Sequence, residues 1–507
     1  MKKHGLAKFG QIIGNLAAGH IHDYESIKTP LADWQVEENE PWILYNVNIV
    51  DVINGKIKEE NSLVISGKKI SELAHSKQLE KLKEHYGVKH IFDGKNQYLI
   101  PGLSDLHCHL SLISEYKLPA NAFYYFDAQR EKNCENALKK GCTFARDSGG
   151  AYDMIHGLMT KIEENRLLGP KIFPSYQLMT SRHGMWDMGA LGMKMGDVLF
   201  GGAFGYIAKN LSDVDKFIEK MCSINAKCIK FYLEEKPIYG GRRDQLYNMF
   251  SQEMVNHITQ KANEYGKVSE AHSMFIKGSR MAIKGRVTSI AHLTVDESYS
   301  EKDAYNMAQN NVAIVPTTTL GCYLAMNFRG AESQDNDEFR FYRDMLEKYT
   351  KASIQNEILP QLKNSYSAFF DFVREEMPER KMPMVGEVYP ERIHGFHTRA
   401  PESFANFRKS GTKIGMGTDG GTGLNFAGNL AVEFAAYKRY GLSEAEILKC
   451  ATINNMEILG LENELGSLDE GKYADMVLIG KNPLTDIEAV QDIKKVYKNG
   501  RCYVEND

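Results

Sequence analysis

The sequence predicts an α/β protein: a (β/α)8 TIM barrel with a small β-sandwich domain built from both chain ends. Between residues 101 and 460, apolar runs of four to eight residues alternate with helical segments of ten or more, a pattern typical of parallel βα units. Eight such runs occur, which is the strand number of a TIM barrel. The flanking segments 42–100 and 461–507 contain short β-branched runs separated by turn signals, and we expect them to form the second domain.

The composition is that of a globular protein with a large core. The 507 residues are 43% hydrophobic and 25% charged, which excludes a disordered or fibrous chain. A net charge of -4 provides no overall field for a polyanion, so we expect no nucleic-acid partner. No stretch reaches the roughly 18 uninterrupted apolar residues of a membrane span, so we expect no membrane partner. Eight scattered cysteines without a CxxC pair favour the reducing cytoplasm.

The first residues, 1–41, are predicted to be a polar extension, to which we assign no chemistry. From Trp42 the runs WILYNVNIVDV, NSLVISGKKISEL and VKHIFDGKNQYLI, separated by Asn-Gly, Ser-Gly and Asp-Gly turns, predict a small antiparallel β unit. The tail from Gly466 returns to short strands. We infer that it joins the early β unit in one domain.

The predicted barrel strands follow one another in a regular order until the last. The eight runs are LIPGLSDLH, CTFARD, KIFPSY, KCIKFYL, KVSEAH, VTSIAH, VAIVPT and KIGMGTD. Almost a hundred residues separate the last two runs, including a charged helical stretch at 335–380. We therefore expect an insertion at about 322–400. Insertions of this size usually serve as a lid or an interface, and we expect a homo-oligomer.

The first barrel run closes on His107-Cys108-His109. Side chains alternate across a strand, so His107 and His109 point to the same side, about 7 Å apart. Two imidazoles in this position can bind one divalent metal ion together. Taken alone, the pair could equally be two surface or core histidines.

Four further residues end predicted strands: Lys230, His272, His292 and Asp419. Catalytic groups of TIM barrels gather at these carboxyl ends, so the five positions together predict a metal-dependent active site. An ammonium group repels metal cations. Lys230 becomes a ligand if its amine is carboxylated to a carbamate, which offers two anionic oxygens to bridge a metal pair; the alternative is an unmodified, solvated lysine.

The sequence resembles the amidohydrolase superfamily of metal-dependent hydrolases. Within it, the chain is similar to the prolidase-like group of dipeptidases and acyl-amino-acid hydrolases, and more distantly to imidazolonepropionase. The matching stretches run in family order from about residue 43 to 500: LIPGLSDLHCHL, GCTFARDSGG, GPKIFPSYQLMTSRHG, CIKFYLEE, VSEAHS, SIAHLT, AIVPTTT, GMGTDGG and GSLDEGKYADMVLIGKNPLTDI.

The resemblance implies a role for each strand-end residue. His107 and His109 would bind the more buried of two divalent ions, expected to be zinc, and His272 and His292 the more exposed one. Carboxylated Lys230 would bridge the two. Asp419 would ligate the buried ion and act as general acid and base. The implied reaction is attack of a metal-bridging hydroxide on an amide C–N bond in a small substrate, a dipeptide or N-acyl amino acid.

Two alternatives stay open. A mononuclear deaminase or cyclic-amide hydrolase, imidazolonepropionase-like, typically adds a glutamate shortly after the fifth-strand histidine. Here AHSMFIKG follows with no acid after His272, which together with Lys230 favours two metals and amide hydrolysis. The other alternative, a catalytically silent barrel acting as a binding or assembly module, is disfavoured by the complete ligand set.

Four residues are predicted to contact the substrate. Arg182, His183 and Trp186 occupy the loop after the third strand, where His183 matches a substrate-facing, catalytic position of prolidase-like relatives, and Arg182 could add an anion contact. Arg146 ends the second strand at the barrel mouth; a structural ion pair is the alternative. The hydroxyl of Tyr232, two residues beyond Lys230, could assist an oxyanion, unless the ring is a rim aromatic.

Two glycines, Gly420 and Gly421, follow Asp419. Without a Lys-Ser/Thr partner they do not make a nucleotide-binding loop, and we expect them to let the backbone approach the metal site closely.

Overall fold

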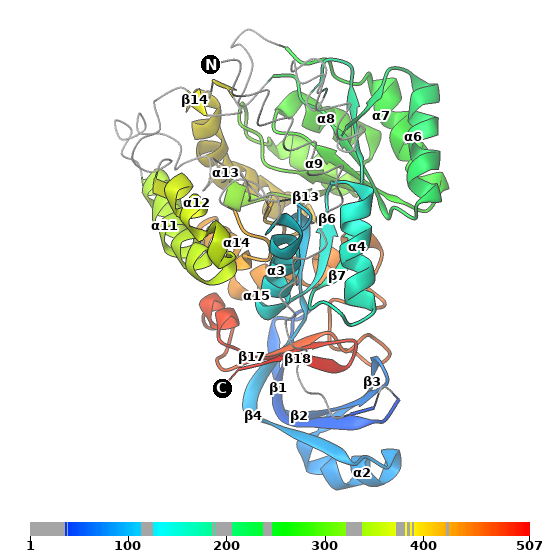
Figure 1. Ribbon diagram of the computed structural model, residues 1–507, viewed down its shortest axis with the longest axis vertical. Helices are drawn as coiled ribbons and strands as arrows, with labels where there is room; N and C mark the ends of the chain where they lie inside the picture. The colour runs from blue at the N-terminus through cyan, green and yellow to red at the C-terminus, as the bar shows by residue number, and fades with distance from the viewer. Residues whose placement is uncertain are drawn as a thin grey trace.

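Two parallel sheets and one sheet of seven strands organise the chain in the computed structural model (Figure 1). Helices surround the parallel sheets in the upper part of the view, and the seven-stranded sheet lies below them. The structure describes residues 36–37, 39–112, 125–184, 187, 205–236, 246–320, 337–371, 381–382, 386–387, 390–421 and 425–506.

The parallel strands coincide with the predicted barrel runs. One sheet has the order β5-β6-β7 and the other the order β13-β12-β11-β10-β8-β9, and every pair in both is parallel. Their bounds are β5 Leu103–Cys108, β6 Cys142–Asp147, β7 Lys171–Pro174, β8 Leu178–Ser181, β9 Gly205–Ala208, β10 Cys228–Tyr232, β11 Val268–His272, β12 Ser289–Ala291 and β13 Ala313–Val315. The short strands β8 and β9 were not predicted.

Helices follow most of these strands, as the alternating pattern predicts. They bury one apolar side against the sheets, as Val214, Phe217, Ile218 and Met221 do in α6. The described helices around the parallel sheets are α3 Phe126–Lys139, α4 Tyr152–Glu163, α6 Leu211–Ser223, α7 Gln252–Glu264, α8 Ile276–Gly285, α9 Glu301–Gln309, α13 Pro390–Ser410, α14 Leu430–Arg439, α15 Glu444–Ala451 and α16 Ile453–Leu459.

The eighth predicted run, 413–419, lies between β13 and β5 without forming a continuous strand. On one side Ile314 N donates to Lys413 O at 3.0 Å, and on the other Leu106 N donates to Met416 O at 2.8 Å. Parallel bridges join Ile314 to Ile414 and Cys108 to Gly420. The result is a TIM-barrel-like α/β fold.

Strands from both chain ends share the seven-stranded sheet, in the order β18-β17-β16-β4-β1-β2-β3. Its core includes Trp42, which stacks on Tyr497 with ring centroids 5.4 Å apart and donates from Nε1 to Gly500 O at 3.0 Å. The strands are β1 Trp42–Asp51, β2 Lys56–Ser66, β3 Lys69–His75, β4 His90–Pro101, β16 Met476–Ile479, β17 Ile493–Lys498 and β18 Arg501–Glu505. The two-layer sandwich and the domain boundaries stay predictions.

One prediction for this sheet was wrong. The unit is not wholly antiparallel, because β1 pairs with β4 in parallel. After β3 the chain passes through helix α2 Leu79–Tyr86 and returns on the other side of β1, and such a crossover brings the next strand back in the same direction.

The predicted insertion contains two long helices, α11 Asp337–Glu357 and α12 Pro360–Asp371, and the short strands β14 Lys381–Met382 and β15 Gly386–Glu387. It is fastened to α3: Gln129 Nε2 donates to Glu357 O at 3.2 Å, and Leu359 N donates to Gln129 Oε1 at 2.9 Å. The helices therefore lie on the flank of the barrel beside α3 and α14 (Figure 1). Within the described part of the chain, no helix is long and apolar enough to cross a membrane.

Candidate metal centre

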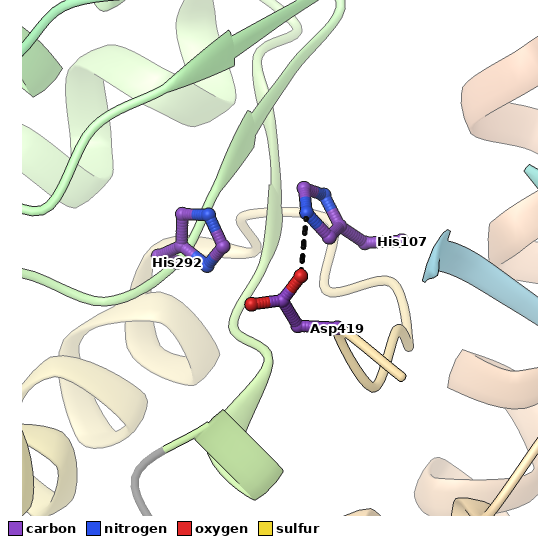
Figure 2. Close-up of side chains that lie close together, drawn as sticks. All are labelled: His107, His292 and Asp419. Atoms are coloured by element: carbon purple, nitrogen blue, oxygen red, sulfur yellow. Dashed lines mark ion pairs between the residues drawn. The ribbon is translucent and has the colours of Figure 1, made fainter. Parts of the chain in front are cut away.

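Three buried side chains from three strand ends converge at one point (Figure 2). His107, His292 and Asp419 each offer one ligand atom, and these atoms all lie within 4.8 Å of one another. His107 Nε2 is 3.4 Å from Asp419 Oδ1. Imidazole nitrogens combined with a carboxylate oxygen form a donor set that suits a divalent transition metal or zinc. The residues present therefore fit the predicted metal.

His109 joins this group through close backbone packing. Its Nε2 lies 3.2 Å from Asp419 Oδ1, and its backbone N donates to Gly420 O at 2.6 Å. The next residue, Gly421, has φ +103°, and an added Cβ would come within 2.0 Å of His109 O. The expectation that these glycines allow a close backbone approach is confirmed.

Hydrogen bonds to the outer ring nitrogen orient three of the histidines. The Nδ1 atoms of His107, His109 and His292 lie 2.5 Å from Glu270 Oε1, 2.9 Å from Gly149 O and 2.7 Å from Thr317 Oγ1. A carbonyl and a carboxylate only accept, so Nδ1 of His107 and of His109 carries the proton. Thr317 donates its own hydroxyl proton to Pro316 O, so it accepts from His292. In all three rings the Nε2 lone pair remains for a metal.

His272 approaches the group with its other nitrogen. Its Nδ1 is 2.8 Å from His292 Nε2, and its ring stacks on Tyr232 with centroids 4.1 Å apart. Burial lowers the pKa of His272 well below its ordinary value, and the neighbouring His292 lowers it further. Burial also depresses the pKa of His292, with His107 adding to the effect. Both rings are held in the neutral form that binds metals.

Lys230 lies on β10 and is wholly buried. Its partner in the register of the neighbouring strand β11 is Glu270. Its Nζ lies 3.3 Å from Glu270 Oε1, yet it has no hydrogen-bond partner among the described residues. Burial lowers the pKa of this amine. The buried amine is therefore not the solvated strand-end charge of the alternative interpretation.

Sequence reasoning missed Glu270, the acid at the centre of this charge cluster. Its Oε1 accepts from Arg146 Nη2 at 2.8 Å and contacts both His107 and Lys230. Burial alone would raise its pKa, but Arg146, Lys230 and His107 hold the pKa of Glu270 well below its ordinary value. The available signal was its place two residues before His272, on the same face of the strand.

The predicted substrate contact of Arg146 needs correction. Its side chain is wholly buried, with Nε donating to Leu106 O at 2.6 Å and Nη1 to Ser289 Oγ at 3.2 Å, in addition to Glu270. These partners all precede the ligands on their strands, so the guanidinium lies in the barrel core. The structural ion pair is the correct alternative.

A second missed acid is Glu234, two residues beyond Tyr232. The sequence has no acid shortly after His272, but folding brings Glu234 Oε1 to 3.1 Å from His272 Nε2, a close contact without hydrogen-bond alignment. Burial raises the pKa of Glu234 well above its ordinary value, and the neighbouring Asp296 raises it further. A positive charge nearby would therefore stabilise the ionised form of this side chain. Chain order could not show the contact, because the two residues come from neighbouring strands.

The other predicted substrate residues are not part of this buried cluster. Arg182 and His183 are exposed in the turn after β8, where His183 has φ +58° and its backbone N donates to Asp187 Oδ2 at 2.8 Å. Trp186 lies outside the described residues. Tyr232 is 8% exposed and reaches the cluster through its stacking on His272.

Two of the candidate ligands and one neighbouring threonine have positive φ angles. His292, Thr317 and Asp419 have φ of 77°, 50° and 57°, which is rare for residues other than glycine and most unusual for a β-branched threonine. The turn after Thr317 is held by Glu433, whose carboxylate accepts from Thr318 Oγ1 at 2.6 Å and from Thr319 N at 2.5 Å. Buried hydrogen bonds to Glu433 thus hold the turn that follows Thr317.

Comparison with known proteins identifies the family of the chain. The sequence model of the amidohydrolase family matches residues 98–502. Over 434 residues the chain is 24% identical to the ochratoxinase of Aspergillus niger, covering 80% of this chain and 75% of that protein. It is 33% identical to the imidazolonepropionase of Phocaeicola vulgatus over 112 residues, 21% of this chain and 27% of that protein. The solved structure of a Xaa-Pro dipeptidase with bound methionine shares the fold, with a TM-score of 0.66 at 20% identity over 92% of this chain and 100% of the other.

Proposed function

The chain belongs to the amidohydrolase family and is a hydrolase acting on C–N bonds, and from this premise we propose that it cleaves the amide of a dipeptide or N-acyl amino acid at a pair of divalent metal ions, expected to be zinc. One observation carries the proposal: His107, His292 and Asp419 converge within 4.8 Å, with His109 and His272 in contact with that group.

We assign the ligands as the resemblance implies. His107, His109 and Asp419 would hold one ion, His272 and His292 would hold the other, and carboxylated Lys230 would serve as a ligand to both. When bound, divalent ions in such a site acidify water to supply a nucleophile at neutral pH and polarise the scissile carbonyl. Asp419 takes the proton from the attacking water and returns it to the leaving amine.

The surroundings of the centre supply the remaining proposed roles. The Tyr232 hydroxyl, on a ring stacked against His272, stabilises the developing oxyanion. Arg182, His183 and Trp186 contact a small substrate from the loop after β8. We further propose that the parallel strands form one closed barrel with residues 101–460, that 42–100 and 461–507 form the second domain, and that the enzyme is a cytoplasmic homo-oligomer with its 322–400 insertion as lid or interface.

Metal analysis combined with a substrate panel tests this proposal. We expect two equivalents of divalent metal per chain and hydrolysis of at least one class among dipeptides and N-acyl amino acids. His107→Ala should abolish activity. His257→Ala is a matched control. His257 lies on α7 and pairs with Asp215 at 2.8 Å, so its loss should leave activity unchanged. Absence of bound metal, or full activity after His107→Ala, would contradict the proposal.

A second candidate is a mononuclear deaminase or cyclic-amide hydrolase. The observation that favours it is the position of Glu234, whose Oε1 lies 3.1 Å from His272 Nε2. This contact places an acid beside the histidine that such enzymes pair with a glutamate. Release of ammonia, or ring opening of a cyclic amide, with one metal equivalent per chain would select this candidate. The silent barrel has no support from the family.

A further inference from the structure

We propose that a second cavity, at the other end of the parallel strands from the metal centre, binds a small monocarboxylate with an apolar body. The cavity measures about 510 Å³, and its lining comes mainly from α4, the start of β7 and the β17–β18 hairpin. None of the lining residues belongs to the metal centre. The volume lies in the range of cavities that hold small molecules, about 300–1,000 Å³. Binding here does not require the reaction proposed for the metal centre.

The cavity lies at the junction between the seven-stranded sheet and the three-stranded sheet β5-β6-β7 (Figure 1). Lys171, the first residue of β7, lines it, whereas the candidate metal ligands stand at the carboxyl ends of their strands. Two hydrogen bonds join the two sides: the Tyr503 hydroxyl donates to Asn165 Oδ1 at 2.7 Å, and Lys498 Nζ donates to Gly169 O at 2.5 Å. Packed elements on both sides therefore build the cavity, and such junctions are common places for ligands.

Two cationic side chains of the hairpin gather around one aromatic ring in this cavity. Lys498 Nζ lies 5.0 Å from the centre of the Tyr503 ring, and Arg501 Cζ lies 5.5 Å from it. Lys498 is 3% exposed, and burial lowers its pKa to about 8, so its amine is still mostly protonated at neutral pH. The buried Nε of Arg501 has no hydrogen-bond partner among the described residues, and no described acid forms an ion pair with either cation. Buried cations are rare without a counter-charge, which a bound anion would supply.

The charges of the lining favour a ligand with one negative charge. Lys171 pairs with Asp475 at 3.0 Å, and Glu40 pairs with Lys89 at 3.0 Å. The other charged residues of the lining are three cations and two acids: Lys68, Lys498, Arg501, Glu37 and Glu163. Together they leave one positive charge for the ligand. A carboxylate matches this balance and the forked donors of an arginine, whereas a phosphate monoester carries about -1.5 to -2 charges.

Apolar side chains supply the rest of the lining. They are Val36, Trp42, Met159, Ile162, Ile172 and Tyr503. Ligand sites combine such walls with a few polar groups that fix the orientation of the ligand. A carboxylate attached to a hydrocarbon or aromatic body would use both parts of the lining.

Titration calorimetry of the full-length protein with phenylacetate and with hexanoate tests the site. We expect saturable binding of at least one of them. Arg501→Gln and Lys498→Met should each weaken it by about 10- to 100-fold, because a hydrogen bond to a charged group is lost. Arg501→Lys keeps the charge and should retain more affinity than Arg501→Gln. Arg166→Gln is the matched control: Arg166 pairs with Glu164 outside the cavity lining, and its loss should leave the affinity unchanged.

Equal thermal unfolding of ligand-free wild type and Arg501→Gln shows that the variant folds. A crystal structure with phenylacetate should place its carboxylate beside Lys498 and Arg501, and inorganic phosphate should not displace it. Carboxylate bound at the metal centre alone would show an affinity that Arg501→Gln does not change. That result, no saturable binding of either carboxylate, or binding of phosphate in preference to both, overturns the inference.

Discussion

Glu270 Oε1 lies 2.5 Å from His107 Nδ1, so a carboxylate in the barrel core orients the first histidine of the metal centre. The same oxygen accepts from the buried Arg146 guanidinium at 2.8 Å. The core and the site are therefore joined through one acid, and a change at Glu270 should affect both.

Glu270→Gln should destabilise the protein strongly. Removing this charge leaves the Arg146 guanidinium buried without its anion, and breaking a buried ion pair in this way costs about 3–5 kcal/mol in the free energy of unfolding. Denaturant titration measures the change. Glu264→Gln, at a surface pair with Lys261, is the control that should leave stability nearly unchanged. Equal effects of the two variants would contradict the arrangement described.

Gly421→Ala should damage both folding and metal binding. The residue has φ +103°, and the new Cβ would meet His109 O at 2.0 Å, so the backbone beside a ligand must move. Gly266→Ala is the matched control, because Gly266 has φ +62° with nothing within 4 Å of its would-be Cβ. The control should show only the backbone cost of about 1–2 kcal/mol. The check is zinc content and unfolding of both variants; a Gly421→Ala protein with full zinc would refute the expectation.

The pH dependence of stability should carry a contribution from Glu433. Burial raises the pKa of Glu433 from an ordinary 4.5 to about 7. Between these values the folded chain holds a proton that the unfolded chain releases, so the contribution is present below pH 4.5 and is lost as pH rises toward 7. Each pH unit in this window lowers the free energy of unfolding by about 1.4 kcal/mol.

Glu433→Gln removes this titration. Compared with wild type, the variant should gain relative stability as pH rises from about 5 to about 7. Denaturant unfolding of both proteins at several pH values measures the difference. A difference that stays constant across the series would show that Glu433 does not titrate in this range.

Tyr232→Phe should separate chemistry from metal binding. The ring keeps its stacking on His272, so zinc content and KM should change little. If the hydroxyl supports the oxyanion, kcat falls by about 10²- to 10³-fold. Tyr265→Phe, at a residue 46% exposed, serves as the control for a lost surface hydroxyl. An unchanged kcat would leave Tyr232 with a packing role alone.

The positions of the candidate histidine and aspartate ligands could be predicted from the local sequence pattern. Alternation along a strand places His107 and His109 on one side, and parallel strands that end at the same edge bring His272, His292 and Asp419 to one region. The family resemblance inferred from these motifs is confirmed by the match over residues 98–502. The strand runs were predicted for the same reason, since buried parallel strands are continuous apolar segments.

The contacts between strands could not be predicted from the sequence. By itself it determined which side chains stand at the strand ends, because that depends on a period of two and on chain order. Only the tertiary structure decided that Glu270 pairs with Lys230 across the β10–β11 register, that Arg146 turns into the core, and that Glu234 meets His272. These contacts depend on register and burial. Both are properties of neighbouring strands packed together, and no single segment of the chain encodes them.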